Sequence, residues 1–175
     1  MSLKTKITES MLDHVYRLEQ ARKNEIELNG EFVTIWPAKG QLKTIKENNT
    51  FYFSQNTSVK PGLILSHVDY ATLFLITTIT EQAGRLAADT LQFPAKASFY
   101  TAVPVNTDII GRTHYSLREQ NWKQIPCTPL EKNKVTLPMP YVPDLGDVLR
   151  IGNDNFKVLA VVKDDVTVTA TVEDF

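Results

Sequence analysis

The chain has 175 residues, of which 42% are apolar and 22% are charged. This composition is typical of a globular protein and excludes a disordered one, and the length suits one ordinary domain or two small ones. The net charge of −1 excludes a whole-protein field that would draw the chain onto nucleic acid or an anionic membrane, although a local basic patch remains compatible with it.

The N-terminal segment, residues 1–24, predicts an amphipathic helix from about Thr8 to Lys23. Four apolar residues recur at helical spacing and form one stripe, namely Ile7, Met11, Val15 and Leu18. Thr8 is a suitable N-cap because its hydroxyl can accept a hydrogen bond from a free N–H of the first turn. We expect the stripe to pack against the chain's own sheet, and the surface of a partner is the alternative.

From Glu25 onward the pattern changes to a period of two, which indicates β-strands. Strands over 25–28 and 31–36 flank Asn29-Gly30, a dipeptide typical of a type I′ hairpin turn. Pro37 ends the second strand because it cannot donate to a ladder. Residues 38–50 are polar and basic and predict a mobile loop.

The rest of the chain predicts many short antiparallel strands. Residues 71–80 are nearly all apolar or β-branched and predict a strand buried on both faces. Residues 85–93 suit a short helix or a returning strand, and the strand is preferred. The other predicted strands are 50–53, 97–105, 134–137, 147–151, 156–162 and 166–172, with hairpin turns at 153–154 and 164–165.

This pattern predicts a mainly β fold, in which the helix precedes an antiparallel barrel or sandwich. The strands form either one continuous domain or two related small units, 25–111 and 112–175. Residues 112–134 hold the proposed junction, because Pro126 and Pro129 disfavour regular structure there.

A repeat supports the two-unit interpretation. A Gly-bounded pair of apolar strands occurs at Gly62, within 59–76, and again 84 residues later at Gly146, within 143–162. A duplication and a chance likeness of two hairpins both explain it, because Gly-bounded strand pairs are common.

No motif specifies a reaction. The three histidines, His14, His67 and His114, lack the spacing of paired metal ligands, and Ser66, His67 and Asp69 are too close in sequence to converge as a triad. Gly152–Asn155 and Asp164-Asp165 resemble turns more than calcium or acid–base sites. The only cysteine, Cys127, excludes an intramolecular disulfide framework and has no neighbouring base to activate it. We therefore predict no enzyme, no metal and no cofactor.

Targeting signals are also missing from the sequence. No apolar run follows the first residues, as it would in a signal peptide, and no apolar stretch approaches the length of a membrane span. We expect a protein that is cytoplasmic at synthesis, neither secreted nor bound to a membrane.

One stretch combines lysines with aromatic residues, as surfaces that bind single-stranded nucleic acid do. The residues of this hypothesis are Trp36, Lys39, Lys43, Lys46 and Tyr52. The alternative is that the alternate aromatic residues, Phe51 and Phe53 among them, face the core while the lysines only keep a loop soluble.

One hairpin resembles a sequence pattern found in small virion proteins of tailed bacteriophages and prophages, including head-completion, neck and tail components. The residues that carry the resemblance are Gly146-Asp147-Val148-Leu149, Gly152-Asn153 and Phe156 to Val161. The resemblance implies a non-enzymatic structural or morphogenesis protein of a virion, for head–tail joining or the tail. Such a protein assembles with itself and with other virion proteins. It also implies docking elements in 38–50 and 126–143 that stay mobile until a partner orders them, and a helix that packs across a subunit boundary. The partner-binding residues it suggests are Lys39, Gln41, Lys43, Lys46, Asn48 and Asn49.

Overall fold

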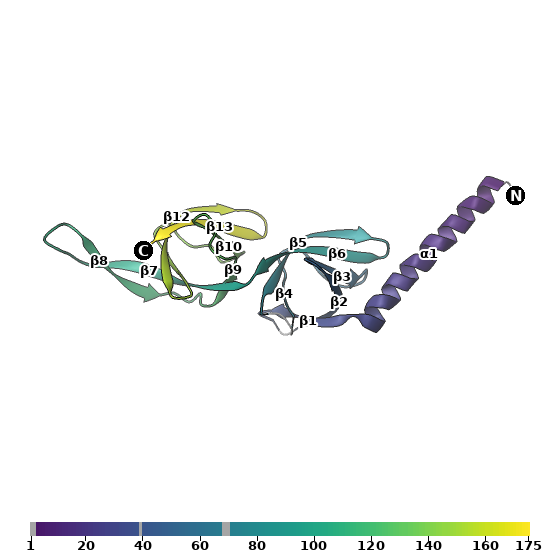
Figure 1. The fold of residues 1–175 in the computed structure, drawn as a ribbon, viewed down its shortest axis with the longest axis horizontal. Helices are drawn as coiled ribbons and strands as arrows, with labels where there is room; N and C mark the ends of the chain where they lie inside the picture. Colours follow the sequence, from purple (N-terminus) through teal and green to yellow (C-terminus); the bar gives the residue numbers. More distant parts are fainter. Residues whose placement is uncertain (1–2, 39, 68–70) are drawn as a thin grey trace. The chain divides into compact units, whose positions relative to one another are not determined.

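The computed structural model describes residues 3–38, 40–67 and 71–175. The fold is mainly β with an N-terminal helix and antiparallel sheets, as predicted (Figure 1). The chain forms two compact units, Met1–Leu91 and Gln92–Phe175. The sequence suggested a boundary between residues 111 and 112. The boundary lies earlier because the segment before residue 111 is a strand of the second sheet.

Helix α1 spans Leu3–Asn29 and is longer than predicted. Residues 25–28 are helical, so the predicted hairpin at Asn29-Gly30 is wrong. Gly30 instead closes the C-terminus of the helix, where its N–H donates to the C=O of Ile26 over 3.0 Å. A Cβ at Gly30 would lie 2.3 Å from that oxygen, so the close approach requires glycine. Asn-Gly is common at the C-terminal ends of helices as well as in hairpin turns, and in this chain it ends a helix.

The first unit holds a closed barrel of six strands, in the order β1-β2-β3-β6-β5-β4. The strands are β1 (Glu31–Trp36), β2 (Gln41–Glu47), β3 (Thr50–Ser54), β4 (Ile64–His67), β5 (Leu73–Gln82) and β6 (Arg85–Phe93). Two three-stranded meanders, β1 to β3 and β4 to β6, close on each other through the pairs β1–β4 and β3–β6. The core consists of Val33, Phe51, Phe53, Leu65, Phe74, Ile76 and Ala88.

Strand β2 occupies the segment that the sequence predicted as a mobile loop, so that prediction is wrong. Thr44 is buried in the middle of β2, and its Oγ1 donates to the C=O of Tyr52 on β3 over 2.9 Å. The lysines made the segment look like a polar loop and hid the period-two pattern of a strand. Long lysine side chains can lie along a barrel with their ammonium groups in water. Residues 85–93 are a strand, as preferred. In β5 residues 73–76 are buried in succession and none of the later residues is buried, so burial on both faces holds only for the first four residues of the strand.

The second unit is a sheet in the order β10-β13-β12-β11-β7-β8, with β9 paired to β7. The strands are β7 (Ala95–Thr107), β8 (Thr113–Glu119), β9 (Ile125–Cys127), β10 (Lys134–Pro138), β11 (Val148–Ile151), β12 (Asp154–Lys163) and β13 (Thr167–Asp174). The last four match the predicted strands closely. The gap between β9 and β10 is bridged by Thr128, whose N–H donates to the C=O of Thr136 over 3.0 Å.

The repeat seen in the sequence is also a repeat of hydrogen bonding. The Gly62 N–H donates to the Ile76 C=O, and the Ile76 N–H donates to the Leu63 C=O, each over 2.8 Å. Gly146 makes the same exchange, because its N–H donates to the Val158 C=O over 2.9 Å and Val158 donates to the Asp147 C=O over 2.8 Å. Both glycines have positive φ, 93° and 88°.

The strands that follow the two glycines also correspond. Leu65 pairs with Phe74 across β4 and β5, and Leu149 pairs with Phe156 across β11 and β12, so a buried Leu–Phe pair stands at the same register in both units. Strands β4 and β11 then pair with β1 and β7 in the same antiparallel register. The two units therefore share one strand connectivity, in which β1 to β6 correspond to β7, β9, β10, β11, β12 and β13.

Replacing Gly146 with alanine should destabilise the second unit by about 1–2 kcal/mol, because an L-residue is strained at positive φ. No atom lies within 4 Å of the added Cβ, so the cost is conformational and not a clash. Urea unfolding followed by Trp122 fluorescence in a Trp36→Phe background measures it, since Trp122 packs on Phe99 in the second core at 5.2 Å between ring centroids.

Gly152→Asn is the matched control for this prediction. Gly152 has a φ of 63°, which asparagine adopts more readily than alanine does. Its unfolding midpoint should move less than that of Gly146→Ala. Equal shifts in the two variants would contradict the conformational role of Gly146.

Candidate protein-interaction surface

The second unit carries an element that the first unit lacks. Trp36 and Tyr100 are equivalent, because each pairs with the first residue of the neighbouring strand, Ile64 of β4 or Val148 of β11. In the first unit residues 37–40 connect β1 to β2. In the second unit β7 continues to Thr107, and the chain returns through β8 before β9 begins at Ile125. The part of the chain over 101–119 is called the β7–β8 hairpin below.

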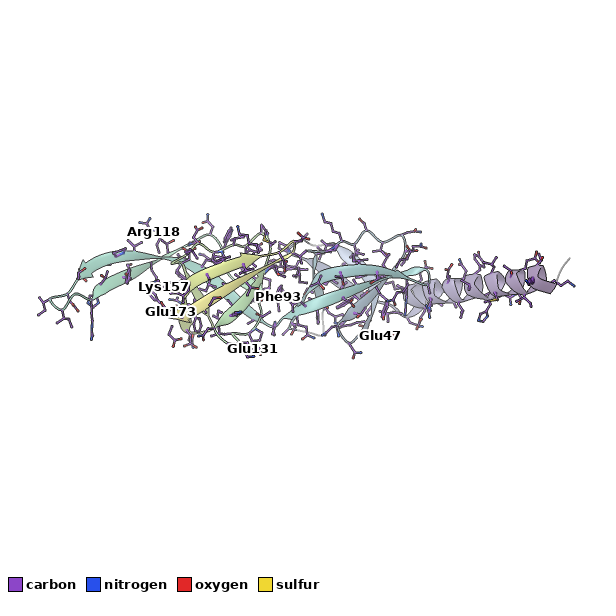
Figure 2. All side chains as sticks on the ribbon, turned by 90° about the horizontal axis from the view of Figure 1, so that it is seen from above. Glu47, Phe93, Arg118, Glu131, Lys157 and Glu173 are labelled. Carbon is purple, nitrogen blue, oxygen red and sulfur yellow. The ribbon has the colours of Figure 1, made fainter. Side chains whose placement is uncertain are left out.

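The β7–β8 hairpin leaves the sheet as a two-stranded ribbon (Figure 1). The ladder between β7 and β11 ends at Tyr100, whereas the ladder between β7 and β8 continues to the pair of Thr107 with Thr113. Every residue of β8 except Leu117 is exposed. Figure 2 shows Arg118 on this ribbon, and Lys157 and Glu173 on the paired strands β12 and β13. A two-stranded ribbon is only marginally stable alone in water, so this one is poised to gain stability from a partner.

The tip of the hairpin is held in a fixed turn. The Oδ1 atom of Asp108 accepts hydrogen bonds from the N–H groups of Ile110 at 3.0 Å and Arg112 at 2.8 Å. The Asp108 N–H also donates to the Arg112 C=O over 2.9 Å, and Gly111 takes a positive φ of 82°. This arrangement leaves Ile109 and Ile110 105% and 69% exposed. Two branched apolar side chains at the end of a ribbon are typical of a protein contact.

A second apolar feature of the same unit is an open groove of about 430 Å³ beside β12. Its apolar lining includes Leu145, which is 70% exposed, together with Val142, Leu159 and Val161. Asp144 and Lys163 are the charged residues of its lining. A neighbouring hollow of about 400 Å³ at the base of the hairpin shares Val142 and Asp144 and adds the carboxylates of Glu119 and Asp147. Because Glu119 is paired with Lys123 over 3.0 Å, the acidic character of the end nearest Asp144 comes from Asp144 and Asp147.

Helix α1 exposes its apolar stripe. Ile7, Met11, Val15 and Leu18 are each 45–65% exposed, so the prediction that the stripe packs on the chain's own sheet is wrong. The helix contacts the barrel through other residues. Ile26 is buried, and Glu19 lies beside Gly84 in the turn between β5 and β6. These contacts lie in the C-terminal part of the helix, at Glu19 and Ile26, whereas the stripe occupies residues 7–18, so the barrel leaves the stripe uncovered.

The partner-binding residues suggested by the sequence lie on β2 and its turn. Gln41 is exposed and pairs with Thr34, and Lys43 donates to the C=O of Glu27 at the end of α1. Lys46 donates to the C=O of Asn48. The C=O of Asn49 accepts from the N–H and hydroxyl of Thr90 at 2.9 and 2.6 Å, so Asn48 and Asn49 form a tight turn and not a mobile loop. Lys39 lies outside the described residues.

The residues of the nucleic-acid hypothesis do not form one face. Lys43 and Lys46 are three positions apart on a strand and point to opposite faces. The Lys43 ammonium lies 5.7 Å from the ring of Phe32, whereas that of Lys46 lies 5.3 Å from the ring of the core residue Phe74. Tyr52 is covered by Arg85, whose guanidinium lies 3.8 Å from the ring centroid. Trp36 lies on β1, which is separated from Tyr52 by β2.

The Pro-rich segment 126–143 was expected to stay mobile until a partner ordered it. Its first residues, Pro126 and Cys127, are buried in β9, and residues 134–138 form β10, so this expectation is wrong for much of the segment. Burial raises the pKa of the Cys127 thiol from 9.0 to about 12. The thiol is therefore protonated at neutral pH and unreactive.

Of the histidines, only His67 is buried, and its Nε2 lies 2.6 Å from the Oε2 of Glu31. Ser66 and His67 are consecutive on β4 and point to opposite faces, and Asp69 lies outside the described residues. Within residues 3–38, 40–67 and 71–175, no group of three or more His, Cys, Asp or Glu side chains is placed to hold a metal ion. No helix in these ranges is long and apolar enough to cross a membrane.

Comparison with protein-family models, with curated proteins and with solved structures finds no match for this chain. The exposed Ile109 and Ile110 were also missed by the sequence analysis. The available signal is two adjacent isoleucines within a turn sequence that begins with aspartate and ends with glycine. Apolar residues at the centre of a turn have no core to enter, so they indicate a contact.

Cys127 should not react with a thiol reagent such as Ellman's reagent in the folded protein, and should react fully in guanidinium chloride. Its pKa leaves less than about 1% of the thiol ionised at neutral pH, and the buried sulfur is shielded as well. An Ile110→Cys variant is the control, because its second thiol stands at the exposed tip and should react at once. Rapid reaction of the wild-type protein under native conditions would contradict the burial of Cys127.

Proposed function

We propose that this chain is a non-enzymatic assembly protein that acts through protein–protein contacts, and that the assembly is the virion of a tailed phage or prophage. The observation that carries the proposal is the β7–β8 hairpin, with Ile109 and Ile110 held outward at its tip. Exposed apolar side chains on an ordered element are costly in water, and a contact surface is the usual reason that they are kept.

The comparison between the two units supports this role for the hairpin. The first barrel closes with only residues 37–40 in the equivalent place, so a barrel of this connectivity does not need the hairpin to fold. An element that the fold does not need, and that exposes branched apolar residues, is best explained by a partner. Helix α1 adds a second exposed apolar surface, its stripe, at the other end of the sequence.

The choice of a virion rests on the resemblance of the segment from Gly146 to Val161 to small phage proteins. Head–tail joining and tail components are the roles that the resemblance suggests. A single-stranded nucleic-acid module is the weaker alternative, because its lysines and aromatic rings are spread over different faces and strands. The net charge of −1 also provides little attraction for phosphate.

The proposal predicts that the chain is incorporated into large particles. An N-terminally tagged copy expressed in the strain that encodes the chain should sediment with gradient-purified particles, as detected by immunoblot. The tag belongs at the N-terminus because the ring of the C-terminal Phe175 packs 5.8 Å from that of Tyr115 on the hairpin. The Ile109→Ser/Ile110→Ser variant should be incorporated at least tenfold less, because its tip no longer offers apolar surface to bury.

Val162→Ser is the control for this experiment. Val162 is 69% exposed on β12, so its replacement removes exposed apolar surface from elsewhere in the same unit. The control should be incorporated like the wild-type chain, and thermal unfolding should show that both variants are folded. A wild-type chain found only in the soluble fractions would overturn the proposed function.

A further inference from the structure

The tip of the hairpin and the groove beside β12 are complementary surfaces on one chain. We propose that Ile109 and Ile110 of one copy dock into the groove lined by Val142, Leu145, Leu159 and Val161 of a second copy. This inference rests on the proposed function in taking the hairpin as a docking element, and it adds the partner and the surface that receives it.

The apolar parts of the two surfaces suit each other. The tip presents two branched aliphatic side chains, and the groove is open and lined mainly by aliphatic ones. Leu145 remains 70% exposed in the groove, so both sides carry apolar surface that the contact would remove from water. The tip is held by the hydrogen bonds of Asp108, so docking orders few additional groups.

The tip carries the cation of Arg112, and the groove lining carries the anion of Asp144 as well as the cation of Lys163. Arg112 follows the two isoleucines at the tip, and Asp144 stands at the end of the groove next to a hollow that contains Glu119 and Asp147. Within the described part of the chain, the side chains of Arg112 and Asp144 are both exposed and make no ion pair with each other or with any other residue. The Asp108 carboxylate is already engaged by the amides of the tip and by His114, whose Nε2 lies 3.5 Å away.

The contact is between copies because the tip does not occupy the groove of its own chain. Ile109 is 105% exposed and Ile110 is 69% exposed. A contact between two different surfaces of identical chains is heterologous, so every open assembly still offers one free tip at one end and one free groove at the other. Such a contact produces a ring if its rotation closes and a filament if it does not.

A mixing experiment tests this geometry. Ile109→Ser/Ile110→Ser removes the tip and keeps the groove, whereas Leu145→Glu/Leu159→Glu blocks the groove and keeps the tip. By sedimentation velocity over a range of concentrations, the wild-type chain should associate beyond a dimer. Each variant alone should associate at least tenfold more weakly, and an equimolar mixture should form a 1:1 dimer that does not grow.

A cross-link traps the contact if it is short-lived. A tagged Ile110→Cys chain mixed with an untagged Leu145→Cys chain should form the mixed disulfide under mild oxidation. A mixture of Ile110→Cys with Val162→Cys should form at least tenfold less, because Val162 follows the lining residue Val161 and points to the opposite face of β12. The buried Cys127 takes no part in either reaction.

The outcomes separate this inference from the proposed function. A wild-type chain that stays monomeric and gives no mixed disulfide overturns docking between copies, while incorporation into particles would still support an assembly role with another partner. Association that survives loss of the tip also overturns it. A dimer from the two mixed variants, with a chain that is absent from particles, supports docking between copies and rejects the virion.

Discussion

Strand β7 is the element on which the second unit depends, because it pairs with three other strands, β11 on one edge and β9 and then β8 on the other. Near Ala97 one edge pairs with β11 and the other with β9, so that β7 joins these two strands within the sheet. Beyond Tyr100 the ladder to β11 ends, and the edge that faced β9 pairs with β8. The same continuous strand therefore anchors the hairpin in a packed core, which gives the tip a firm base.

The two units allow a comparison within one molecule. Both have a glycine at positive φ before the strand that pairs with β1 or β7, and both bury a Leu–Phe pair just after it. These shared features are what the fold requires. The features found in one unit only, the hairpin and helix α1, are additions to a fold that is already complete. Such additions are where function is to be sought, since the scaffold fixes their base and leaves their surface free.

Local patterns predicted much of the β structure, because alternation and turn residues act over a few positions. Strands β10 to β13 and the glycine repeat were predicted for this reason. The hairpin turn predicted at Asn29-Gly30 was wrong because the same dipeptide also ends helices. Here the burial of Ile26 against the barrel favours a helix before it. Residues 38–50 misled because lysines can line a strand. The tip and the groove could not be predicted from local patterns, because the positions and exposure of Ile110 and Leu145 depend on which distant strands pair.

The turn at the tip resolves a conflict between exposure and order. Two exposed isoleucines on a loose loop would tend to collapse onto the nearest apolar surface, and a partner would have to reorder them. Asp108 prevents this because its carboxylate accepts two backbone N–H groups of the turn, and Gly111 supplies the positive φ that the turn requires. The ribbon below the tip is held by the backbone hydrogen bonds of the β7–β8 ladder, so the hairpin reaches outward as an ordered element. Because the loop is already ordered, a contact at the tip does not lose binding free energy to ordering it.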